Sequence, residues 1–115
     1  MPPRPYSTKL LSLFAGMLLL TACSRNHITL HNQGTNTWQQ VKLQAGGESF
    51  RVAELAGSAS EHFSFRSSAE DGGNVSAVLN GTTNQQAIGY FSPSLSSDHA
   101  ITFSDDGTIT VITIP

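Results

Sequence analysis

The chain has a single cysteine, few charged residues and no cluster of positive charge. One cysteine in 115 residues excludes an internal disulfide. Lysine and arginine together number 6, against 8 aspartates and glutamates, so no basic patch is available to neutralise phosphates and nucleic-acid binding is not expected. Charged residues make up 12% of the chain and hydrophobic residues 38%, a balance typical of a small folded domain rather than a disordered polyelectrolyte.

Long hydrophobic runs are also missing, except for one at residues 10–20. As a helix, this run would span about 16 Å, well short of the roughly 30 Å hydrocarbon core of a bilayer. Arg4 and Lys9 precede it, and no acidic residue lies among residues 1–9. A positive segment followed by a short apolar segment is the pattern of a secretory signal peptide, and it predicts one here rather than a permanent transmembrane helix.

The lone cysteine follows this run directly, in the sequence Leu20-Thr21-Ala22-Cys23. This motif resembles the lipobox of bacterial lipoproteins. The resemblance implies cleavage before Cys23, a thioether diacylglycerol on its sulfur and an acyl group on the new amino terminus. One acyl chain anchors a protein only marginally, whereas two or three hold it firmly in a membrane. The alternative is an ordinary signal peptide with an incidental cysteine near the cleavage site.

In bacterial lipoproteins an Asp directly after the lipidated cysteine favours retention in the inner membrane, and this chain has Ser24 there. The resemblance therefore implies the periplasmic leaflet of the outer membrane, with the inner membrane as the alternative. The predicted organisation is a signal peptide at 1–22, a short lipidated tether at 23–27 and a domain at 28–115. The four residues between Cys23 and the first predicted strand, 24–27, span at most about 14 Å when extended. The domain is therefore expected to lie close to the membrane surface.

Beyond residue 27 the hydrophobic residues alternate with a period of two, and helical periodicity is absent. Turn signals recur every 8–12 residues, which indicates an all-β antiparallel sandwich or small barrel of about seven to eight strands. The predicted strands span residues 28–31, 38–45, 50–55, 61–66, 75–79, 82–91, 100–103 and 108–114. Asn80-Gly81 predicts a type I′ hairpin, and residues 67–73 and 93–98 are predicted to be polar loops.

Two of these strands carry irregular patterns. In residues 50–55 the apolar positions change parity, which predicts a bulge or a crossing between sheets. The last strand, 108–114, has apolar residues on both faces and is predicted to be buried on both faces over part of its length. Its end is followed by Pro115, which can blunt a strand edge.

The segment from Ile28 to Gly34 resembles the opening of bacterial immunoglobulin-like modules, in which a strand is followed by Asn and then a small residue with Gly. The resemblance continues to residue 66, with Ala56 where such modules often have Pro. It implies a single small antiparallel immunoglobulin-like β-sandwich. It implies a fold and not an activity, because such modules serve as adhesin parts, scaffolds and accessory subunits.

The four histidines are candidates for a metal site. His27 and His31 would lie about 13 Å apart on a strand, too far to share an ion whose ligand bonds are near 2 Å. His62 and His99 are each adjacent to an acid and are predicted to be solvated on the surface. A composite zinc site built from separate strands has no support in the sequence, so no metal is predicted.

Other candidate residues have simpler structural interpretations. Tyr90 and Phe91 are candidates for an exposed aromatic interaction surface, but the favoured interpretation places both rings in the core, on opposite faces of the sheet, with Gly89 as a bulge. Trp38 is predicted to be core rather than a ligand platform. The sequence Asp105-Asp106-Gly107 lacks the spacing of a calcium loop and predicts a hairpin.

No catalytic residues are predicted, since there is no G-x-S-x-G elbow or comparable constellation. The chain is therefore expected not to be an enzyme and to carry no cofactor beyond the lipid on Cys23. We expect a membrane-anchored envelope lipoprotein that acts as an accessory or binding module for another envelope protein. The alternative is a periplasmic inhibitor or immunity lipoprotein against a cell-wall hydrolase, with its inhibitory loop at 67–73 or 93–99. An enzyme site assembled from separate strands is the remaining alternative.

Overall fold

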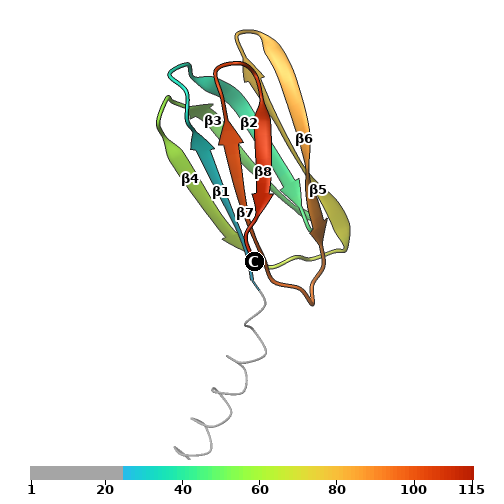
Figure 1. The fold of residues 1–115 in the computed structure, drawn as a ribbon. Coiled ribbons are helices and arrows are strands. Elements are labelled where there is room, and N and C mark those ends of the chain that lie inside the picture. Colours follow the sequence, from blue (N-terminus) through green and yellow to red (C-terminus); the bar gives the residue numbers. More distant parts are fainter. Residues whose placement is uncertain (1–24) are drawn as a thin grey trace, which may run out of the picture.

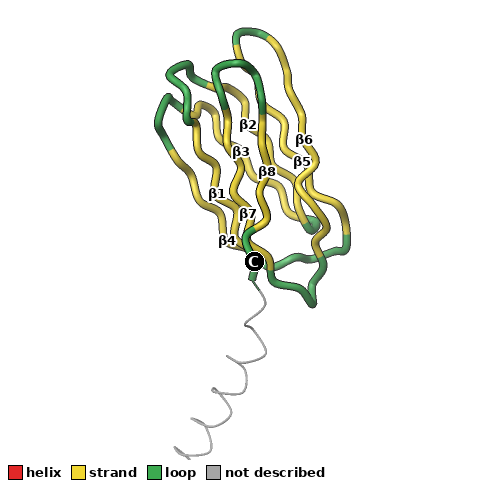
Figure 2. Tube along the Cα trace, in the orientation of Figure 1, coloured by secondary structure: helices red, strands yellow, loops and turns green. Residues whose placement is uncertain are grey.

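A computed structural model describes residues 25–115, and every described element is a strand (Figures 1 and 2). The predicted signal peptide and the motif at 20–23 lie outside the described residues. Within the described part, no helix is long and apolar enough to cross a membrane. The strands are β1 (Asn26–Asn32), β2 (Trp38–Ala45), β3 (Glu48–Leu55), β4 (Ser60–Phe65), β5 (Asp71–Leu79), β6 (Thr82–Phe91), β7 (Ser97–Phe103) and β8 (Ile109–Thr113).

The strands form two four-stranded sheets that pack as a sandwich (Figure 1). We call them the β1 sheet, in the order β4-β1-β7-β8, and the β2 sheet, in the order β3-β2-β5-β6. The neighbouring strands are antiparallel, except that β1 and β7 are parallel. Of the two predicted architectures, the sandwich is therefore correct.

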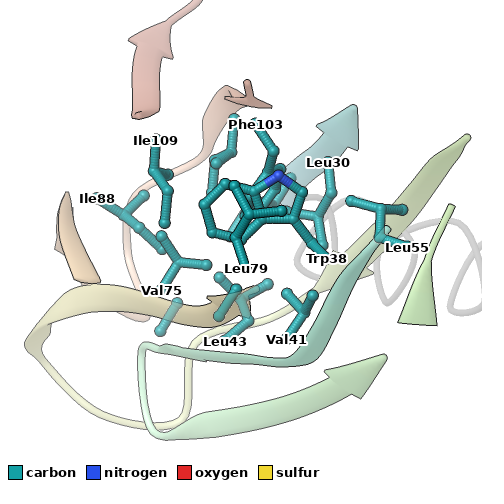
Figure 3. Packing of buried hydrophobic residues seen from close by; sticks show 14 of the residues in the cluster. Leu30, Trp38, Val41, Leu43, Leu55, Val75, Leu79, Ile88, Phe103 and Ile109 are labelled. Atoms are coloured by element: carbon teal, nitrogen blue, oxygen red, sulfur yellow. The ribbon is translucent and has the colours of Figure 1, made fainter. Parts of the chain in front are cut away.

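The core lies between the two sheets and is centred on Trp38 (Figure 3). Its side chain is 0% exposed, and its ring meets Phe103 of the opposite sheet edge to face at 5.2 Å between centroids. Leu30 also comes from the β1 sheet, while Leu43 and Leu79 come from the β2 sheet, and all three are buried. Each sheet buries one face against the other sheet, which explains the alternation of apolar and polar residues along the strands.

A bulge in β2 explains the change of parity predicted for residues 50–55. Between the β2–β5 pairs Gln39↔Val78 and Lys42↔Ser76, β2 contains one residue more than β5, and Gln40 adopts a φ of 50°. The extra residue lets both Trp38 and Val41 face the core although they are three apart. β3 stays in register with β2 through this kink, so its apolar positions change parity at the same point.

Five strands begin earlier than the sequence indicates, and the difference is largest for β5 and β7. β5 begins at Asp71 and β7 at Ser97, so the predicted loops at 67–73 and 93–98 were too long, and the connections are 66–70 and 92–96. Gly72 and Gly73 belong to β5, opposite Tyr90 and Gly89 of β6. Gly73 is closely packed, since a Cβ there would lie 3.2 Å from the carbonyl oxygen of Gln44, whereas Gly72 is exposed. A glycine pair that appears to be a loop is here a strand segment.

Asn32, at the end of β1, is a fully buried polar residue. Its Nδ2 donates to the carbonyl oxygens of Asn36 and Leu55 at 2.8 and 2.9 Å, and its Oδ1 accepts from the N–H of Gly34 at 2.9 Å. The side chain therefore joins the β1–β2 connection to the end of β3. A buried amide that is satisfied in this way specifies one path for the chain.

Asp105, in the β7–β8 hairpin, binds the same β1–β2 connection through hydrogen bonds. Its carboxylate accepts hydrogen bonds from the N–H groups of Thr35 and Asn36 and from the Thr35 hydroxyl, all at 3.0 Å. These hydrogen bonds hold the pKa of Asp105 below its usual value, and the bond from the N–H of Asn36 has the largest effect. The segment Asp105-Asp106-Gly107 is thus a hairpin, as predicted.

Both termini of the described chain lie at one end of the sandwich (Figure 1). Asn26 is opposite Ser97, and the N–H of Ile114 donates to the carbonyl of Asp98. The connections 46–47, 66–70 and 92–96 are at this same end, since Ser68 bonds to Gly46 and Ser96 to Arg25. We call this the terminal end.

Candidate functional site

The outer face of the β1 sheet brings together residues from all four of its strands. Strand pairing aligns His62 with Thr29, Thr29 with Ala100, and Ala100 with Ile112. Histidines therefore occupy the β1 and β4 side of this face, and isoleucines occupy the β8 side. No second layer covers this face among residues 25–115, since the other sheet packs on the opposite side.

The β8 side exposes apolar side chains. Ile112 is 55% exposed and Ile114 is 44% exposed, whereas Ile109 is 7% exposed and belongs to the core. The predicted burial of both faces of 108–114 was therefore wrong at Ile112 and Ile114. The strand alternates with period two, so Ile109 and Val111 fill the inner face while Ile112 and Ile114 face outward.

β8 is also an edge strand, which pairs only with β7. An edge strand presents unpaired N–H and C=O groups that can pair with another chain, and charged residues normally protect it. Residues 107–115 have no charged side chain. Large apolar residues on an unprotected edge therefore make β8 the strongest candidate for an interaction surface in the described part of the chain.

The protection of edges differs between the two sides of the sandwich. β6, the edge of the β2 sheet on the β8 side, is also uncharged (Figure 1). The two edge strands on the other side, β3 and β4, carry Glu48, Arg51, Glu54 and Glu61. The charges thus protect one side and leave the other, which we call the β6–β8 side, open to strand pairing.

Tyr90 and Phe91 lie on opposite faces of β6, as the favoured interpretation predicts, but its placing of Tyr90 in the core was wrong. Phe91 is 1% exposed and belongs to the core, so it is not part of an interaction surface, whereas Tyr90 is 56% exposed. The predicted bulge is present, because the β5–β6 register shifts next to Gly89. The Tyr90 hydroxyl donates to Glu70, and this hydrogen bond raises the pKa of Tyr90. Trp38 is core, as predicted.

His99 is buried, and its predicted exposure on the surface was wrong. Its side chain is 3% exposed, because β7 begins at Ser97 and places His99 on the inner face together with Ile101. Its ring packs on Phe91 at 5.1 Å between centroids, and its Nδ1 has no hydrogen-bond partner in the described structure. Burial lowers the pKa of His99, because a charged imidazolium is poorly solvated there.

This burial predicts a loss of stability in mild acid. The unfolded chain binds the His99 proton near the ordinary pKa of 6.5, and the folded chain binds it at lower pH. The stabilisation is therefore complete above about pH 6.5 and is lost as the pH falls below it. Urea unfolding at about pH 7.5 and about pH 5 measures this loss. His99→Leu is expected to flatten the dependence, and an equally steep dependence in the variant would contradict the assignment to His99.

The other three histidines are on the outer face of the β1 sheet, as predicted for surface residues. His27 and His62 come from adjacent strands and are in contact, with 5.4 Å between ring centroids. The Nδ1 of His31 lies 2.8 Å from the hydroxyl oxygen of Ser60. His62 reaches His27 because β4 pairs with β1. The spacing of His27 and His31 along one strand does not predict this contact. In residues 25–115 no three His, Cys, Asp or Glu side chains form a group that could hold a metal ion.

Comparisons with known proteins bear on the fold. No protein-family model matches the chain, and no curated protein matches it. A solved NMR structure of a protein from Eubacterium rectale is similar, with a TM-score of 0.53 and 19% sequence identity. The alignment covers 79% of this chain and 89% of that one. At this identity the similarity supports the all-β fold alone.

Proposed function

We propose that this protein is a lipid-anchored accessory module of the bacterial cell envelope, without catalytic activity, which binds another envelope protein through β8. The observation that carries the binding role is the uncharged β8 edge with Ile112 and Ile114 exposed. Strand addition at an open edge uses main-chain hydrogen bonds for affinity and outward side chains for specificity. The partner is identified only as a protein with a complementary edge strand.

The anchor is supported by Leu20-Thr21-Ala22-Cys23, and the outer membrane by Ser24. The described strands begin at Asn26, so the tether from the lipidated residue to the domain is very short. The terminal end is thus the end next to the membrane in this proposal. β8 runs toward it, because Thr113 is opposite His99 near the start of β7.

Replacing Cys23 by Ser is expected to remove the lipid and to leave an uncleaved precursor. Metabolic labelling with radioactive palmitate, followed by fractionation, measures both effects, because a Ser hydroxyl cannot form the thioether. We expect label in the natural chain and none in the variant. Label of equal intensity in Cys23→Ser would refute lipidation at this position.

An Ile112→Lys variant tests the binding role. A lysine on the outer face of an edge strand opposes pairing with another chain. We expect it to abolish a crosslinked adduct that forms at native expression level between the natural protein and an envelope partner. Ile112 is largely exposed, so the change is expected to alter the free energy of unfolding by no more than about 0.5 kcal/mol.

Ser64→Lys is the matched control, because Ser64 is exposed on β4, the opposite edge of the same sheet. The adduct is expected to survive this change. Loss of the adduct in both variants, or in neither, would contradict binding through β8.

We further propose that the sandwich is of the immunoglobulin-like type. The order β3-β2-β5-β6 corresponds to C′-C-F-G of immunoglobulin domains, and the β1–β4 pair corresponds to B and E. β7, parallel to β1, takes the place beside B that strand A occupies, which is a departure from that type.

The alternative function, inhibition of a cell-wall hydrolase, is supported by one feature of the 92–96 connection. Leu95 is 49% exposed there, at the terminal end. This connection has five residues and lies beside the proposed anchor, so the β8 edge is the favoured surface. Inhibition of a murein hydrolase by the Leu95→Ser and Ile112→Lys variants tests this alternative. Loss of inhibition in Leu95→Ser, with inhibition kept in Ile112→Lys, would favour the inhibitor.

A further inference from the structure

The two histidines that meet on the outer face of the β1 sheet are close enough to act together. The Nδ1 of His27 lies 3.4 Å from the Nε2 of His62. Their rings are inclined by 27°. Strand register produces the contact, since His27 pairs with Ser64 and His62 with Thr29 on the adjacent strands β1 and β4.

This nitrogen–nitrogen distance is long for a hydrogen bond, which usually falls at about 2.7–3.2 Å for an N–H donor. It also matches the separation of two ligands of one metal ion. Zinc binds imidazole nitrogens at about 2.0–2.1 Å with tetrahedral angles, which places two such nitrogens about 3.4 Å apart. The backbone of two paired strands therefore already holds the nitrogens at the separation that a shared ion requires.

Thr29 supports the ligand form of His62. Its hydroxyl oxygen lies 3.1 Å from the Nδ1 of His62, whereas His27 contacts the other ring nitrogen, Nε2. When that hydroxyl accepts the Nδ1–H, the lone pair is left on Nε2, the atom that faces His27. Metal-binding imidazoles are commonly oriented in this way by a second hydrogen bond.

The surroundings leave the ion accessible. Asp98 pairs with His27 across β1 and β7, and it lines a shallow hollow with His27 and Arg25. The contacts of His62 with His27 and Thr29 are exposed to solvent, so water can complete a coordination sphere.

We propose that His27 and His62 form a two-histidine site for a divalent first-row transition metal, with Cu²⁺ bound most tightly and Zn²⁺ less tightly. Imidazole suits both ions, and the order follows the general affinity series of these metals. Because no third His, Cys, Asp or Glu in residues 25–115 joins the pair, the remaining positions are filled by water. The site is separate from the β8 edge and does not depend on the proposed binding role.

The experiment is a Cu²⁺ titration of the full chain carrying Cys23→Ser, in detergent micelles. Calorimetry measures the affinity and stoichiometry, and electron paramagnetic resonance measures the number of coordinated nitrogens. The serine removes the only thiol, which would otherwise compete for copper. The full chain is needed because a chain beginning at Arg25 would place a free amine two residues before His27 and create an artificial chelate. We expect one equivalent of Cu²⁺ with hyperfine coupling to two imidazole nitrogens.

Variants in the same background locate the site. His27→Gln and His62→Gln are each expected to weaken Cu²⁺ binding at least about tenfold and to remove one coupled nitrogen. Thr29→Val keeps both ligands and is expected to weaken binding about tenfold, in the range usual for loss of an outer hydrogen bond. His31→Gln is the matched control, since His31 is on the same face but bonds to Ser60.

The proposal is overturned if His62→Gln binds Cu²⁺ as tightly as the parent, or if His31→Gln weakens binding as much as His62→Gln. It is also overturned if the spectrum of the parent shows a single coupled nitrogen. Circular dichroism of each metal-free variant establishes that it is folded, so a loss of binding reports on the ligands.

Discussion

Replacing Trp38 by alanine is expected to lower the free energy of unfolding by about 4 kcal/mol, the largest effect of any single change considered for this protein. Trp38 is 0% exposed and is the largest fully buried side chain. It contacts Phe103 of the opposite sheet, so its removal leaves a cavity between the sheets that neither can close alone. Urea unfolding followed by far-ultraviolet circular dichroism measures the loss without needing the indole signal.

Because small domains are stable by only about 5–15 kcal/mol, this change brings the domain close to unfolding. Trp38→Phe is the informative control. The indole Nε1 is buried without a hydrogen-bond partner in the described structure, so phenylalanine removes an unsatisfied donor while retaining a ring. We expect it to cost less than about 2 kcal/mol. Equal losses for the two variants would contradict the assigned role of ring volume.

Asn32→Ala is expected to cost about 3 kcal/mol. The change leaves the carbonyl oxygens of Asn36 and Leu55 and the N–H of Gly34 without the partner that Asn32 provides. Each unsatisfied buried group costs about 1–3 kcal/mol, although water entering the small gap can recover part of it. Thermal unfolding of the variant measures the loss as a lower Tm.

The control is Asn36→Ala, the same substitution at an exposed side chain four residues further on. It keeps the backbone carbonyl that Asn32 binds, and we expect a change within about 0.5 kcal/mol. Asn32→Asp separates the two functions of the amide, because it keeps an acceptor for Gly34 but removes both donors. An aspartate that is as stable as the natural chain would contradict the importance of those donors.

The sequence predicts this fold well where hydrophobic alternation is regular. The bounds of β2 and β6 agree with residues 38–45 and 82–91, and the bulges near residues 50–55 and Gly89 have visible signals in parity and in glycine. Local patterns of this kind need no knowledge of neighbouring strands. They are sufficient for an all-β sandwich but not for the arrangement of its strands.

The missed features depend on contacts between distant segments. Burial of His99 follows from a β7 that begins three residues earlier, beside β1. Gly72-Gly73 is strand because it pairs with β6 and, at Gly73, packs closely on β2. Exposure of Ile112 follows from the lack of a second layer over the outer face of the β1 sheet, which no pattern within β8 reveals. The contact of His27 with His62 likewise depends on the register of β1 and β4.

The pairing of β1 with β7 has a consequence for the order in which the strands can pair. Asn26 is opposite Ser97, so the first strand of the domain meets its parallel neighbour only 71 residues further along the chain. Contacts between residues so distant in sequence make folding slow, because a long loop must close before they form. Until β7 joins the sheet, β1 has only β4 as a neighbour, and one of its edges stays open to pairing with other chains.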